Sequence, residues 1–189
     1  MNKSHTVKRN LLIVGGMIVL LLLLDQWLKI YVKNNFQLGE VHPVFGDWFV
    51  MEYIENRGMA FGTSFGNKAW HKLALSIFRI IAVGALIYYW VKKAREGMKL
   101  SFLVPLGLII AGAMGNLLDS MYYDYYFPYD PCFPYNIQEG SGIWTECNVW
   151  GFTDKIETKP RGFLFGNVVD MFKFDATWPK GTPIVGGEP

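Results

Sequence analysis

The chain has 189 residues, of which 51% are hydrophobic and only 18% are charged, and its formal net charge is +2. The apolar residues gather in long runs separated by polar, aromatic and Gly/Pro-rich stretches, which is typical of an integral membrane protein rather than a soluble one. Nucleic-acid binding is not expected, because membrane topology accounts for most of the basic residues.

Three segments are long and apolar enough to cross a bilayer, for which a helix needs about 20 residues. They cover about residues 11–32, 73–91 and 100–118. Arg79 is the one charge in the second segment, and the third has none. These runs predict an α-helical integral membrane protein.

A signal peptide is the competing interpretation of the first run, because Lys8 and Arg9 precede it. No small-x-small cleavage pattern closes the run, however, and Asp25 and Lys29 occupy that place. We therefore expect a retained membrane helix.

Basic residues predict the orientation. They precede the first helix and fill the link between the second and third, at Lys3, Lys8, Arg9, Lys92, Lys93, Arg95 and Lys99. Both regions should be cytoplasmic by the positive-inside rule. The segment 33–70 and everything after Asp119 should then face outward.

Two outward segments differ in character. Residues 36–69 contain alternating aromatic and branched residues from Val44 to Ile54, which predicts a small half-buried sheet on the membrane surface. The insert over about 121–166 is rich in Tyr, Phe, Pro and Gly and is either a lid over a substrate or a passive outer loop.

The insert contains Cys132 and Cys147. Thiols on the oxidising side of a membrane can form a disulfide, but the sequence leaves their pairing open. No metal site is expected, because two cysteines without nearby histidines fall short of the usual four zinc ligands.

Polar clusters lie where the apolar segments meet water. They are Asn56–Gly62, Gly115–Asp119 and Val168–Met171. Carboxylates and carboxamides are costly to hold near hydrocarbon, so their presence in several segments predicts one shared polar site. That indicates chemistry at a membrane surface.

Together with Asp25 and Lys29, these clusters resemble, in the same order, the motifs of lipoprotein signal peptidase (signal peptidase II, aspartic peptidase family A8). The resemblance covers the chain from its first helix to about Met171. It implies a single membrane-embedded peptidase domain with four helices, an outer sheet that cradles substrate, and no cofactor. It also implies diacylglyceryl-prolipoprotein substrates, contact with membrane lipids, and a site at the outer face of the bacterial cytoplasmic (inner) membrane.

The resemblance assigns one catalytic aspartate, Asp170 in Val-Val-Asp-Met. The family's second aspartate lies in a later Phe-Asn-x-Ala-Asp motif that opens a fourth helix, and the sequence has no such motif. Asn167 has the right spacing to Asp170 but belongs to the first motif, and Asp175 matches neither. We therefore expect a C-terminally incomplete chain that hydrolyses little or nothing.

The other matched residues are expected to bind substrate or support the aspartates. Asp25 and Lys29 share a helix face and should form an ion pair. Asn56 is a candidate for binding the substrate backbone, and Arg57 and Gly58 are expected to form a turn. Asn116 and Asp119 lie one helical turn apart and should face the same polar interior.

One departure from the family pattern concerns a cation. The family usually has arginine after the Gly-Asn-x-x-Asp aspartate, where this chain has Ser120. We hypothesise that Arg79 replaces that cation by pairing with Asp119 or a neighbour; snorkelling to the interface is the alternative.

Two other functions remain open at the level of sequence. A membrane protein that binds signal peptides without cutting them would need no second aspartate. A small transporter could use Asp25, Lys29 and Arg79 along a polar path.

Overall fold

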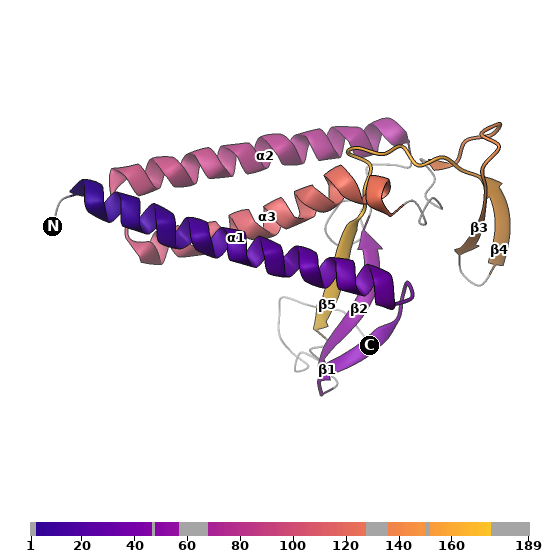
Figure 1. Ribbon diagram of the computed structural model, residues 1–189, viewed down its shortest axis with the longest axis horizontal. Coiled ribbons are helices and arrows are strands. Elements are labelled where there is room, and N and C mark those ends of the chain that lie inside the picture. The colour runs from indigo at the N-terminus through magenta and orange to yellow at the C-terminus, as the bar shows by residue number, and fades with distance from the viewer. Residues whose placement is uncertain (1–2, 47, 57–67, 128–135, 150–151, 175–189) are drawn as a thin grey trace, which may run out of the picture.

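The computed structural model describes residues 3–46, 48–56, 68–127, 136–149 and 152–174. Its long helices are α1 (Lys3–Asn35), α2 (Ala69–Glu96) and α3 (Leu100–Tyr126), and all are long and apolar enough to cross a membrane. They run side by side along the long axis of the molecule (Figure 1). The prediction of a helical membrane protein is confirmed.

Local sequence accounts for the connection between α2 and α3. Gly97 ends α2 with φ 89°, a left-handed conformation that glycine adopts without strain, and its N–H bonds to the carbonyl of Ala94. Lys99, which precedes α3, is extended with φ −68° and ψ 153°, so the new helix begins at Leu100. The two helices therefore form a tight antiparallel pair.

Helices α1 and α3 approach closely at Gly107. A Cβ atom there would lie 2.6 Å from Cγ1 of Val14 and 3.1 Å from Cε of Met17, so only glycine fits. Membrane helices gain little from hydrophobic burial against one another, so small residues and close contact hold them together. This contact sets the spacing of the two helices that carry the polar site.

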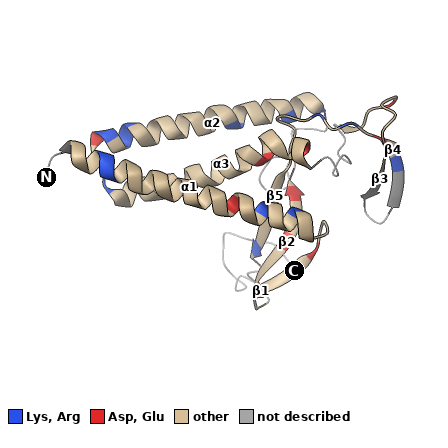
Figure 2. Ribbon diagram, in the orientation of Figure 1, with Lys and Arg blue, Asp and Glu red and all other residues tan. Residues whose placement is uncertain are grey.

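The helices are longer than the sequence predicted. Helix α1 begins at Lys3 instead of at about residue 11, and α3, which was expected to end at Leu118, continues to Tyr126. The extra turns of α3 are not apolar, yet Asp119, Ser120 and Tyr123 are buried against other elements, and these contacts sustain the helix. Charged residues lie mainly towards the two ends of the bundle (Figure 2).

A three-stranded antiparallel sheet of order β1-β2-β5 packs beside one end of the helices (Figure 1). Its strands are β1 (Val41–Phe45), β2 (Phe49–Asn56) and β5 (Val168–Phe174). In the register of β2 and β5, Ile54 lies opposite Asp170 and Asn56 lies opposite Val168. The expected small sheet is present, and it joins two of the polar clusters.

The insert forms a separate hairpin of β3 (Trp144–Val149) and β4 (Phe152–Glu157), which the sequence did not predict. Buried Asp124, near the end of α3, ties this region to the bundle. It accepts hydrogen bonds from Asn136 Nδ2 at 3.0 Å and from the Gly162 N–H at 2.6 Å.

Two apolar cores hold the molecule together. The first lies between the helices and includes Val14, Ile18, Trp90, Leu103 and Ile110. The second lies where the helices meet the sheet and consists of Val32, Tyr53, Tyr123, Val169 and Met171. Because the second core takes residues from α1, α3, β2 and β5, it places the strand of Asp170 against the ends of the helices.

Candidate functional site

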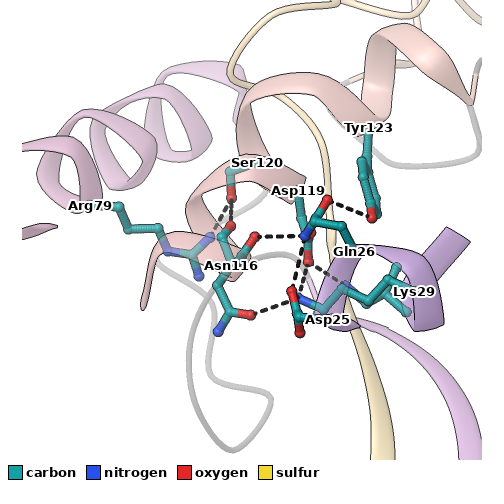
Figure 3. Close-up of polar contacts among 10 residues, drawn as sticks. Asp25, Gln26, Lys29, Arg79, Asn116, Asp119, Ser120 and Tyr123 are labelled. Carbon is teal, nitrogen blue, oxygen red and sulfur yellow. Dashed lines mark hydrogen bonds and ion pairs between the residues drawn. The ribbon is translucent and has the colours of Figure 1, made fainter. Parts of the chain in front are cut away.

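A polar network joins α1 to α3 close to the sheet (Figure 3). At its centre is the Lys29 ammonium group, whose Nζ lies 2.7 Å from Asp119 Oδ2 and 3.3 Å from Asp25 Oδ2. The same atom donates to Asn116 Oδ1 at 3.1 Å. The expected ion pair of Asp25 and Lys29 is present, but the shorter contact of Lys29 is with Asp119.

Asp119 is completely buried, with 0% of its surface exposed. Besides Lys29, it accepts hydrogen bonds from Gln26 Nε2 at 2.9 Å and from the Val169 N–H at 3.3 Å. A buried carboxylate is tolerated only when it is paired and hydrogen-bonded, and these donors meet that requirement. Asp119 thus connects α3 to both α1 and β5.

Gly115 allows this network to form. A Cβ atom at this position would overlap the carboxylate of Asp25, so the glycine lets a side chain of α1 lie directly against the backbone of α3. The Gly115 carbonyl also accepts from Gln26 Nε2 at 3.4 Å.

Two members of the network were not predicted from sequence. Gln26 donates to Asp119, and its Oε1 accepts from the Tyr123 hydroxyl at 3.1 Å. A carboxamide inside an apolar helix is itself a sign of a polar partner, so Gln26 could have been found. Tyr123 carried no such sign, because it lies beyond the expected end of α3.

Asp170 lies on β5 with an exposed side chain, whereas Val168, Val169 and Met171 around it are buried. The strand is therefore fixed by its neighbours while the Asp170 carboxylate faces solvent. This arrangement suits a carboxylate that must meet a substrate or a water molecule.

Gly166 fixes the segment that enters β5. Its N–H donates to the Ser120 carbonyl at 3.0 Å. A Cβ atom at 166 would overlap the Asp119 carbonyl and lie 2.9 Å from the backbone nitrogen of Tyr123. These are backbone atoms of α3 and cannot turn aside as a side chain would.

We predict that Gly166→Ala forces this segment away from α3 and lowers the free energy of unfolding by about 1–3 kcal/mol, the usual cost of overpacking. Thermal unfolding in detergent measures the change. Gly112→Ala is the control, because a Cβ atom at 112 has nothing within 4 Å. Equal stability of the two variants would contradict the prediction.

Arg79 of α2 is half-buried and turns towards α3, where its Nη1 donates to Ser120 Oγ (Figure 3). Ser120 Oγ in turn donates to the Asn116 carbonyl at 3.1 Å. Asp119 and Asp170 both attract the guanidinium electrostatically. Arg79 therefore contacts Ser120, the neighbour of Asp119 in the chain. Ser120 is the residue that stands where the family usually has arginine.

A second buried ion pair, between Lys33 of α1 and Glu55 of β2, was not predicted. Glu55 also accepts from the Tyr53 hydroxyl at 2.6 Å and from Asn167 Nδ2 at 3.0 Å. Burial raises the pKa of Glu55, but the charge of Lys33 and the hydrogen bonds outweigh it and hold the pKa below its ordinary value of 4.5.

This lowered pKa predicts a dependence of stability on pH. Ionised Glu55 contributes stability that is complete above its unfolded-state pKa and is lost as the pH falls through the lower folded-state pKa. Thermal unfolding between about pH 3 and pH 7 should show a decline on the acid side of 4.5 that is smaller in Glu55→Gln. Identical acid profiles would contradict this.

The structure describes some of the other predicted residues but not all of them. Asn56 ends β2 opposite Val168, close in the sheet to the strand of Asp170. Arg57, Gly58 and Asp175 lie outside the described residues, as does Cys132, so the disulfide stays an open prediction. Within the part of the chain that the structure describes, no group of three or more His, Cys, Asp or Glu residues is arranged to hold a metal ion.

Comparison with known proteins gives a consistent set of matches. The family described as "Signal peptidase (SPase) II" matches residues 17–184. A lipoprotein signal peptidase of Porphyromonas gingivalis is 38% identical over 185 residues, which cover 93% of this chain and 70% of the relative. The lipoprotein signal peptidase of Syntrophus aciditrophicus is 38% identical over 109 residues, covering 57% of this chain and 65% of the relative.

Two solved structures are also similar. Both are titled as structures of a bacterial membrane enzyme obtained by the in meso method, at 2.3 and 1.9 Å resolution. Each is 22% identical and covers 82% of this chain. They have TM-scores of 0.48 and 0.47 and are covered over 76% and 80% of their own lengths.

Proposed function

Because the chain belongs to the signal peptidase II family, we propose that it removes signal peptides from bacterial prolipoproteins, with Asp170 as one of two catalytic carboxylates. The observation that carries this assignment is the setting of Asp170. Its carboxylate is exposed on a strand whose flanking residues are buried and tied to a polar network between two membrane helices.

The chemistry requires a partner for Asp170. Two carboxylates close together do not ionise equally, so one keeps its proton. The ionised one draws a proton from water, and the protonated one donates a hydrogen bond to the scissile carbonyl. The water oxygen then attacks the carbonyl carbon, and the proton passes to the leaving nitrogen as the C–N bond breaks.

Asp119 is a poor candidate for that partner. It is fully buried, and its oxygens already accept from Lys29, Gln26 and Val169. The family motif for the second aspartate is absent from these 189 residues. We therefore expect residues 1–189 alone to bind signal peptides but to cleave them slowly if at all.

The membrane setting supports a lipid-modified substrate. Apolar side chains exposed on the helices, such as Leu20, Leu23 and Trp27 of α1, offer a surface for acyl chains. The polar network and β5 would then meet the peptide near the diacylglyceryl-modified cysteine. Asn56 is proposed to bind the peptide backbone through its amide donor and acceptor.

The topology completes the proposal. Lys8 lies near the start of α1, and Lys92 and Arg95 lie near the end of α2. These helix ends lie together at the end of the bundle far from the sheet (Figure 2), which the positive-inside rule assigns to the cytoplasm. The N-terminus is then cytoplasmic, and β1, β2 and β5 lie at the outer face of the inner membrane. All elements would form one peptidase domain.

The function is tested with a synthetic prolipoprotein peptide carrying diacylglycerol on its cysteine. The enzyme is the protein expressed from its gene to the stop codon, purified in detergent. Mass spectrometry should find a product that begins at the lipidated cysteine, and the unlipidated peptide should be cleaved far more slowly. Tight binding without any product would instead indicate a signal-peptide-binding protein.

The proposed role of Arg79 in this function can be tested by substitution. Arg79→Gln should lower kcat by about tenfold, because one charge-assisted interaction beside Asp119 and Asp170 is lost. Adding Ser120→Arg should restore part of the rate by returning a guanidinium to the site from α3. A rate unchanged in Arg79→Gln would show that the residue only anchors α2.

A further inference from the structure

Two lysines on one face of α1 each contact a buried carboxylate on another element. Lys29 contacts Asp119 of α3, and Lys33, one turn later, contacts Glu55 of β2. The exposed fractions of these four side chains are 4%, 0%, 4% and 3%. Residues four apart lie on the same side of a helix, so α1 presents both cations to the same region.

Each carboxylate also accepts a hydrogen bond from the chain where it enters β5, one from the strand itself and one from the residue just before it. Asp119 Oδ2 accepts from the Val169 N–H at 3.3 Å, and Glu55 Oε2 accepts from Asn167 Nδ2 at 3.0 Å. These two attachment points lie on either side of Val168, and Asp170 follows directly. Glu55 moreover lies opposite Val169 in the β2–β5 register.

The Lys33 ammonium group is held from several directions. It donates to the Tyr53 hydroxyl at 3.1 Å and lies 5.8 Å from the ring centre of Tyr123 and 5.0 Å from that of Phe127. These contacts define where the cation sits, and they fix the Glu55 carboxylate through it.

Stability alone is a weak reason for such a pair. Removing two charges from water costs several kcal/mol for each ion, and well-packed apolar residues often serve as well. An apolar pair, however, offers no acceptor for the N–H of Asn167 Nδ2. The ion pair gives Glu55 a fixed orientation from which its second oxygen holds the strand.

We propose that Lys33, Glu55 and Asn167 are positioning residues that fix the backbone carrying Asp170, in parallel with Lys29, Asp119 and the Val169 N–H. The two sets together form a double clamp from successive turns of α1 onto residues 167–169. The inference rests on the proposed function, because it assigns the clamp a purpose in catalysis. A displacement of about 1 Å in a reacting group can cost a hundredfold in rate, which is why such support matters.

The first test needs no catalysis and uses the 189-residue chain. Hydrogen exchange followed by mass spectrometry should show that Asn167→Ala speeds exchange in residues 168–170 by about tenfold, the equivalent of one hydrogen bond. The matched control is Glu52→Gln, which removes the more exposed pair with Lys173 on the same two strands. Unchanged exchange in Asn167→Ala would overturn the clamp.

The second test separates positioning from general stability. In the protein expressed to its stop codon, Asn167→Asp and Glu55→Gln should each lower kcat by about tenfold with KM within about twofold. The double variant exchanges donor and acceptor, so the amide introduced at position 55 can bond the carboxylate introduced at position 167, and most of kcat should return. Singles that match wild type in kcat, or a double variant without recovery, would overturn the inference.

The two tests also separate this inference from the proposed function. If the wild-type protein cleaves no prolipoprotein, the function fails, while the exchange measurement still decides whether the clamp holds β5. If the wild type cleaves and the clamp variants match it, only the clamp fails.

Discussion

Replacing Asp170 with asparagine should lower kcat for prolipoprotein cleavage by about 10²–10⁴-fold, the usual contribution of a general acid or base. Asparagine has nearly the same shape but cannot accept the proton of the attacking water. Because the Asp170 side chain is exposed and its neighbours carry the packing, the fold should be unaffected. Kinetics with the diacylated peptide measure the loss in the protein expressed to its stop codon.

Two controls make this result specific. Substrate affinity of Asp170→Asn should stay within a few-fold of wild type, since the amide removes proton transfer and not the binding surface. Glu146→Gln, which alters an exposed carboxylate of the insert paired with Lys155, should leave kcat unchanged. A fully active Asp170→Asn protein would remove Asp170 from the mechanism.

The second large effect concerns Lys29. Lys29→Met leaves the fully buried carboxylate of Asp119 without its cation, and breaking a buried pair on one side usually costs about 3–5 kcal/mol. We expect a loss of stability of this size, measured by thermal unfolding in detergent. The change should exceed that of any surface pair in the described chain.

Lys93→Met is the matched control, because it also removes a lysine from an ion pair on a long helix. Its partner Glu96 is 42% exposed, and exposed pairs contribute about 1 kcal/mol or less. Adding Asp119→Asn to Lys29→Met should recover more than half of the lost stability, since the uncompensated charge is gone. Equal losses in Lys29→Met and Lys93→Met would contradict a buried network.

Regular spacing predicted the features that depend on neighbouring residues. The apolar runs predicted the three helices, and the separation of Asp25 from Lys29 predicted their ion pair. Alternating aromatic and branched residues predicted the strand that became β2. In each case the cause lies within a few residues of its effect.

Features that depend on tertiary contact were missed. The closest carboxylate to Lys29 is Asp119, 90 positions away, and Glu55 is 22 positions from Lys33. No local pattern states which of several acids a lysine will reach. The end of α3 was missed for the same reason, because Ser120 and Tyr123 stay helical through burial against distant segments.

The candidate site was predicted in part. The sequence placed Asn116 and Asp119 in a shared polar site, and the family resemblance added Asp25 and Lys29. The structure brings these four side chains together. The catalytic role of Asp170 and the substrate-binding role of Asn56 stay predictions, as does the turn at Arg57 and Gly58. Their roles depend on a substrate and on residues that local spacing does not place.

The most direct test compares cleavage of the diacylated peptide by the 189-residue chain and by the protein expressed to its stop codon, each with and without Asp170→Asn. We predict that the protein expressed to its stop codon cleaves the peptide, that Asp170→Asn abolishes this cleavage, and that the product begins at the lipidated cysteine. Cleavage that survives Asp170→Asn, or no cleavage by either protein, would contradict the assignment of Asp170 as a catalytic carboxylate of a signal peptidase.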